Sequence, residues 1–149
     1  MRRVIVIVVL VGSLLIFRAA GALGVPAFAT WVAAARWALA AMFLFTGLAH
    51  FTKAKYGMAP MVPEIFGNAM FWVYFTGACE IAGGIGLLIP RFRSLAGICL
   101  ILLLIAIFPA NAKAAIEHLQ VAGRPATPLW LRLPIQLVFI ALVWWVSRL

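Results

Sequence analysis

The feature that most constrains this chain is a mostly apolar stretch at residues 69–89 that carries one charged residue, Glu80, near its centre. The stretch has about the 20 residues that a helix needs to cross a hydrocarbon layer ~30 Å thick. A carboxyl group at that depth is costly unless it is neutral, paired or hydrated, so such groups usually mark a functional site or a contact between helices. We therefore expect a transmembrane helix here, with a polar site inside the membrane.

The composition of the chain favours a membrane protein over a soluble one. Hydrophobic residues make up 67% of the chain and charged residues 10%, and the mean hydropathy is +1.17. A soluble domain carries about 25% charged and about 45–50% apolar residues. The net charge of +9 comes from basic residues scattered between the apolar stretches, as in loops that meet lipid headgroups. Since they form no single basic patch, we expect contact with a lipid bilayer and no nucleic-acid partner.

Hydropathy predicts four clear membrane spans, each ending near prolines or tryptophans. The spans are residues 31–51, 69–89, 94–111 and 129–145. The predicted fold is all-α, a transmembrane four-helix bundle with an additional N-terminal transmembrane helix. We divide the chain into an N-terminal hydrophobic helix resembling a signal anchor, at residues 1–30, and the bundle, at residues 31–149.

The N-terminal apolar run has two interpretations. Residues 4–17 follow two arginines and could be the hydrophobic region of a cleaved signal peptide, with the small residues at 27–29 imitating a cleavage site. Arg18 and ten further residues separate that triplet from the run, whereas signal peptides keep the two close. An uncleaved helix over residues 3–21 is therefore favoured.

The connections between spans differ in character. Residues 52–68 contain prolines, methionines and phenylalanine, and we expect a loop lying in the membrane interface. Residues 112–121 predict a short helix that Gly123 ends. The few residues at 90–93 force the second and third spans into an antiparallel hairpin. The distribution of basic residues slightly favours an N-terminus on the inner side.

The polar groups within the spans predict a common interior site. Gly77, Glu80 and Gly84 share one helix face, where small residues let another helix approach closely. Glu80 therefore points into the bundle. The other spans bring their own polar groups, and the candidate pocket comprises His50, Glu80, Asn111, Arg132 and Gln136.

Glu80 has two candidate partners, Arg132 and His50. Arg132 is the better one, because a guanidinium binds a carboxylate through two parallel hydrogen bonds. Gln136 and Asn111 would complete the network. Three roles stay open for such a set: it holds helices in register, forms a pocket that binds a ligand, or provides a proton or ion path, for which one central acid makes a poor relay.

Several chemistries find no support in the sequence. There are two histidines and three acids, none in a Glu-x-x-His pair, so neither a carboxylate metal site nor paired haem ligation is expected. The two cysteines lack a C-x-x-C spacing and predict no thiol exchange. No metal site and no catalytic residue is assigned.

Several of these motifs resemble the DoxX-like family of small integral membrane proteins. The matching segments are GLAHF at 47–51, MVP at 61–63, GACEIAGGIGLLIP at 77–90, FPAN at 108–111 and WLRLPIQ at 130–136. The resemblance implies a four-helix bundle associated with membrane redox systems, in a bacterial cytoplasmic (inner) membrane. It does not account for the first 30 residues, since family members typically have four helices.

Three functions follow as hypotheses. The first is an integral membrane subunit or accessory protein that supports a redox system without its own metal or thiol centre, beside another membrane protein subunit. The second is a quinone- or lipid-binding subunit of an oxidoreductase, with quinone as the possible cofactor. The third is a membrane-protein assembly factor or small-solute transporter. A closed, packed interior around Glu80 would argue against the second.

Overall fold

The computed structural model describes residues 5–121 and 123–148 of the chain. Its main helices are α1 (Ile5–Ala22), α2 (Trp31–Ala49), α4 (Ala69–Leu88), α5 (Arg93–Ala106), α6 (Phe108–Ile116) and α7 (Leu129–Arg148). Within these residues, five segments are long and apolar enough to cross a membrane: α1, α2, α4, α7, and α5 with α6 as one span, Arg93–Ile116. The predicted all-α membrane fold is confirmed.

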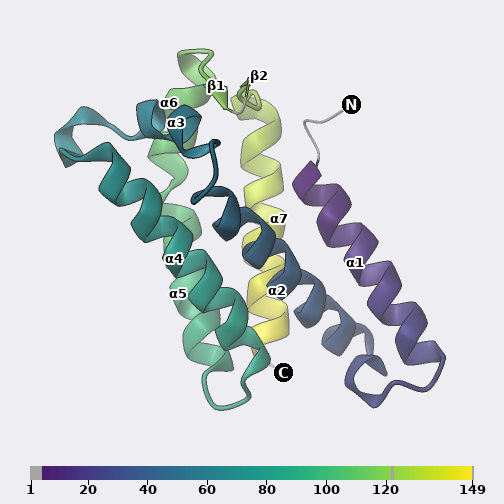
Figure 1. The fold of residues 1–149 in the computed structure, drawn as a ribbon. Coiled ribbons are helices and arrows are strands. Elements are labelled where there is room, and N and C mark those ends of the chain that lie inside the picture. Colours follow the sequence, from purple (N-terminus) through teal and green to yellow (C-terminus); the bar gives the residue numbers. More distant parts are fainter. Residues whose placement is uncertain (1–4, 122, 149) are drawn as a thin grey trace.

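Four of the helices form a closed ring, and the fifth lies outside it. Helix α2 packs against α4 and α7, and α5 packs against the same two helices from the other side (Figure 1). Helix α1 packs mainly against α2, and Leu10 is its buried residue. The bundle with an extra N-terminal helix therefore matches the expected architecture. The division of the chain at residue 30 stays a prediction. The first four residues of the N-terminal segment lie outside the described part.

Two helices of the ring begin at side-chain caps. Thr30 precedes α2 and its hydroxyl accepts a hydrogen bond from the amide of Ala33 at 3.1 Å. Asn68 precedes α4 and its side-chain oxygen accepts from the amide of Phe71 at 3.2 Å. Each cap satisfies an amide that has no partner within its own helix. The chain therefore starts these spans at residues that the local sequence specifies.

The end of the third span was predicted wrongly. Instead of ending at residue 111, the span breaks at Ile107 and continues as α6 to Ile116. Pro109 has no amide hydrogen, so it interrupts α5 but fits the first turn of the next helix. The predicted short helix at 112–121 is thus only the end of α6, and His118, with φ of 51°, turns the chain away.

Short elements cover one end of the ring. The chain between α2 and α4 contains α3 (Lys55–Met58) and two 3-10 turns, η2 (Ala59–Met61) and η3 (Glu64–Phe66). These pack near α6 and near an antiparallel pairing of β1 (Gln120–Val121) with β2 (Arg124–Pro125). Figure 1 shows α3, α6 and the two strands together at the top of the bundle. The connection predicted as an interfacial loop is therefore a structured cover.

The opposite half of the bundle is closely packed, and we call it the closed half. Its fully buried side chains come from all four ring helices: Leu39, Leu87, Leu100, Val143 and Val146. The helices approach so closely that a Cβ on Gly97 would lie 2.4 Å from the side chain of Ser147. The Arg36 guanidinium donates to the Val146 carbonyl at 3.2 Å, which satisfies an acceptor near the end of α7.

Candidate functional site

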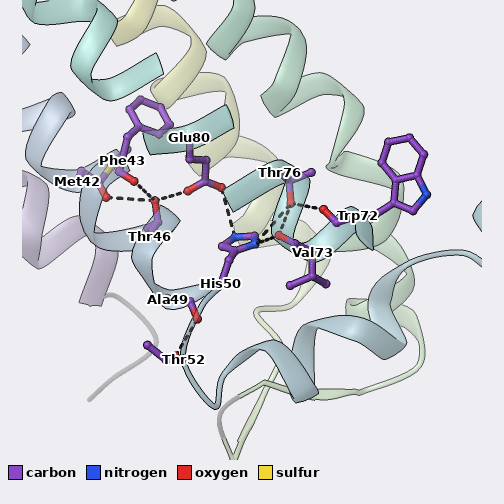
Figure 2. Close-up of polar contacts among 10 residues, drawn as sticks. All are labelled: Met42, Phe43, Thr46, Ala49, His50, Thr52, Trp72, Val73, Thr76 and Glu80. Atoms are coloured by element: carbon purple, nitrogen blue, oxygen red, sulfur yellow. Dashed lines mark hydrogen bonds and ion pairs between the residues drawn. The ribbon is translucent and has the colours of Figure 1, made fainter. Parts of the chain in front are cut away.

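The centre of the candidate site is a pair formed by His50 and Glu80. His50 follows the last residue of α2, and Glu80 lies in the middle of α4 with 8% of its surface exposed. The imidazole Nε2 lies 3.6 Å from Oε1 of Glu80, and the hydroxyl of Thr46 donates to Oε2 (Figure 2). Glu80 therefore points into the protein, as its helix face predicted, and both of its oxygens have partners.

Two glycines bring α2 and α4 close enough for this pair to form. A Cβ on Gly77 would lie 2.5 Å from Cβ of His50, and a Cβ on Gly47 would lie 2.9 Å from the carbonyl oxygen of Gly77. A larger residue at either position would push the helices apart. This close approach places the His50 ring beside Glu80, one turn further along α4.

The hydrogen bonds of His50 define which ring nitrogen carries a proton. Nδ1 lies 2.7 Å from the carbonyl oxygen of Val73. A carbonyl can only accept, so Nδ1 donates. The Thr76 hydroxyl donates to the Trp72 carbonyl at 2.8 Å, which leaves its oxygen free to accept from the same Nδ1 at 3.4 Å (Figure 2). Both contacts hold the proton on Nδ1.

Nε2 of His50 faces the carboxyl group of Glu80 at 3.6 Å, a distance that fits an ion pair. With Nδ1 protonated, Nε2 can bond Oε1 only if one of these two atoms carries a hydrogen. The pair is then either an imidazolium beside a carboxylate or a neutral imidazole beside a carboxylic acid. Thr46 fits both states, because its hydroxyl is also within 3.1 Å of the Met42 carbonyl and can turn to donate there. A proton can pass between the two groups without disturbing the other hydrogen bonds of the framework, whereas its loss would leave Nε2 and Oε1 facing each other as two acceptors.

The pair opens onto a cavity of about 730 Å³. The cavity lies between α2, α4, α5, α6 and α7, beneath the short elements at that end of the bundle, and the first turn of α1 reaches its side. Its walls are mostly aliphatic and aromatic, including Phe43, Met61, Trp72, Leu104 and Phe139. We call this part of the bundle the cavity half. Its interior is an apolar space with a small polar region.

All five residues of the predicted pocket line this one cavity: His50, Glu80, Asn111, Arg132 and Gln136. Gln136 is buried, and its amide nitrogen donates to the carbonyl of Leu104 at 2.7 Å, at the end of α5. Asn111 reaches the cavity from α6. The structure therefore brings the five residues into one space, while the role of that space stays a prediction.

The preferred partner of Glu80 was chosen wrongly. His50, the second candidate, makes the contact, whereas Arg132 forms no hydrogen bond or ion pair within the described residues. Gln136 and Asn111 likewise do not join the Glu80 network. Arg132 is instead a partly buried cation that lines the cavity from the first turns of α7.

Sequence reasoning missed Thr46. It lies four residues before His50, and residues at that spacing share one face of a helix. Its hydroxyl donates a hydrogen bond to the second carboxyl oxygen of Glu80. The spacing alone could have identified it, once His50 was chosen as the partner.

Metal and thiol chemistry receive no support from the described part of the chain. No three His, Cys, Asp or Glu side chains among the described residues could hold a metal ion together. Cys79 and Cys99 are both free.

This chain belongs to the family described as a domain of unknown function (DUF8561), whose model matches residues 39–147. The matched range contains α4 to α6, all but the last residue of α7, most of α2 and all five residues of the pocket, and it leaves α1 outside. No curated protein matches the chain. No solved structure matches it either. The five candidate spans among the described residues indicate a multi-pass integral membrane protein.

Proposed function

We propose that this protein is a non-catalytic membrane subunit whose cavity binds a quinone or a chemically similar lipid for a membrane redox system. The observation that carries the proposal is an open apolar cavity in which Arg132 has no protein partner among the described residues and faces the same space as the His50–Glu80 pair. The interior around Glu80 is not filled by side chains, which is the condition that the quinone hypothesis required.

The size and walls of the cavity suit a lipophilic molecule. Small-molecule sites usually occupy about 300–1,000 Å³ and combine apolar walls with a few polar groups, and this cavity has about 730 Å³. Because the surrounding helices are membrane spans, a ligand of this kind would arrive from the bilayer. Its body would contact aliphatic and aromatic side chains such as Phe139 and Leu104.

Arg132 supports a head group that carries oxygen acceptors. A guanidinium stays protonated in proteins and offers only donors. A partly buried cation without a partner is costly. A hydrogen-bond acceptor on a ligand would therefore stabilise Arg132 and the bound ligand together. A carbonyl oxygen meets this need without adding a negative charge to the cavity that already contains Glu80.

The His50–Glu80 pair supports a ligand that exists in protonated and deprotonated forms. A quinone carbonyl accepts a hydrogen bond, and the hydroxyl of a quinol donates one. The guanidinium of Arg132 can donate the first bond, and the carboxylate of Glu80 can accept the second. In this proposal the electrons belong to a partner protein. The resemblance to DoxX-like proteins supports such a partner and a bacterial inner membrane.

Binding can be measured on the protein in nanodiscs of zwitterionic lipid. A soluble quinone analogue is titrated while tryptophan fluorescence is followed, since Trp72 lines the cavity. We expect saturable quenching that Arg132→Gln abolishes and Arg91→Gln leaves unchanged, because Arg91 lies in the exposed turn between α4 and α5. Absence of saturable quenching, or equal loss in both variants, would overturn the proposal.

A further inference from the structure

A second apolar space continues from the cavity along the membrane spans. It has a volume of about 340 Å³ and lies between α1, α2 and α7. Ile7, Ile135 and Phe139 line both this groove and the main cavity. The two spaces are therefore adjacent and share three lining residues.

The groove leads away from the polar end of the site. In the α2 segment, residues from Met42 to His50 line the cavity, whereas the earlier residues Ala35 and Leu39 line the groove. On α7, the cavity begins at Arg132 and the groove extends to Leu142. Since these two helices run in opposite directions, both series descend from the polar end toward the closed half.

The shape and chemistry of the groove suit a hydrocarbon chain. Every side chain that lines it is apolar. Along α1 it extends from Ile7 to Leu14, which corresponds to roughly 10 Å at the 1.5 Å rise of a helix. A narrow apolar path of this length has no group that could bind a head group, whereas the cavity beside it has several.

We propose that the groove between α1, α2 and α7 holds the hydrocarbon tail of the same molecule whose head group occupies the cavity. This inference rests on the proposed function and specifies the ligand as a lipophilic molecule with a long chain. A ring or head group alone would leave the groove empty. Helix α1 lies outside the part of the chain that the family model matches, yet it supplies one wall of the tail path.

The groove would align the tail more than it would raise affinity. Lipid tails are as apolar as leucine, so moving a chain from the bilayer into the groove gains little from the hydrophobic effect. The proper test therefore locates the tail and does not depend on the strength of binding. Photolabels at two positions of one ligand can do this.

The experiment uses the full chain in nanodiscs and two quinone analogues, one with a photoreactive group on the ring and one with the group midway along an isoprenoid tail. We expect the ring label to modify cavity residues on α2 and α4. We expect the tail label to modify groove residues on α1 and α7. An excess of unlabelled quinone should compete with both.

Matched variants on α1 separate the groove from the lipid surface. Val11 lines the groove and is 45% exposed, whereas Val8 is 60% exposed and lines neither space. Val11→Phe should lower labelling of α7 by the tail severalfold and leave labelling by the ring unchanged. Val8→Phe should change neither.

The outcomes distinguish the two proposals. If neither label modifies the protein in a way that unlabelled quinone prevents, the proposed function itself fails. If the ring label modifies the cavity but the tail label marks lipid-facing residues, or an excess of phospholipid acyl chains displaces only the tail label from the groove, the tail path is wrong and the head-group site stands.

Discussion

The closed half and the cavity half are built from the same four helices but held together by different means. In the closed half, small residues let the helices touch, and large side chains such as Leu87 and Leu100 fill what remains. In the cavity half, Gly47 and Gly77 also bring α2 and α4 together, and polar contacts join the helices further, among them His50 with Glu80 and Gln136 with the Leu104 carbonyl. Space remains between them, and Arg132 faces it. The contrast indicates that one half provides stability while the other gives up packing for a polar space.

Gly97→Val should have the largest effect on stability. Its side chain would enter the contact with Ser147, where even a Cβ would lie 2.4 Å away. Overpacking of this kind costs about 3 kcal/mol, and thermal unfolding in detergent should report it. Gly12→Ala is the control, because nothing lies within 4 Å of a Cβ there. A stable Gly97→Val protein would show that the closed half is looser than described.

Gly77→Ala should rank second and affect both stability and binding. The added methyl would meet Cβ of His50 at 2.5 Å, so the ring must move away from Glu80. We expect a loss of about 2 kcal/mol from strain at the α2–α4 contact, together with weaker quinone quenching. Unfolding and fluorescence titration of one preparation measure both. Normal binding in this variant would mean that the His50 position is not critical.

Replacement of Glu80 should show whether shape and hydrogen bonding or charge dominates in the pair. Glu80→Leu leaves Nε2 of His50 without a partner, which costs about 1–2 kcal/mol. Glu80→Gln should cost less, because an amide can accept from Thr46 and donate to Nε2. Comparison of the two unfolding temperatures decides the matter. Equal losses would indicate that the carboxylate charge is what matters.

Arg132→Met should have the smallest effect on stability. The guanidinium forms no hydrogen bond or ion pair to the described residues, so its removal leaves no protein group unsatisfied. We expect a change within about 0.5 kcal/mol, or a gain from removing a partly buried charge. Quinone quenching should nevertheless disappear. A large loss of stability would assign Arg132 to the fold instead of to a ligand.

Glu80, Arg132 and Gln136 could be grouped from the sequence because their spacing on the helices gives them recognisable faces. Gly77 and Gly84 lie on the same helix face as Glu80, and Arg132 and Gln136 are four residues apart, a spacing that puts both on one face of their helix. Their distances from one another were not predictable, because these depend on how far each helix is rotated and displaced relative to its neighbours. Arg132 was preferred because a guanidinium is chemically the better partner for a carboxylate. The packing of the helices instead places His50 next to Glu80.

The break at Ile107 shows a similar division. Pro109 announced an interruption of the third span, since proline removes a donor and disfavours a continuous helix. Whether the chain would end there or resume as a new helix depended on what lay beside it. The cover formed by η2 packs against α6, and this neighbour was not visible from local sequence.

The amino-acid sequence by itself determined that this chain crosses a membrane and that Glu80 is inside the bundle. Apolar runs of sufficient length have no other stable place, and a carboxyl group cannot face lipid cheaply. Only the tertiary structure decided that Glu80 meets His50, that Arg132 faces an open cavity, and that α1 completes a groove beside it. These outcomes depend on the distances between helices. Gly47 and Gly77 bring α2 and α4 close together, whereas the helices around the cavity leave a space between them.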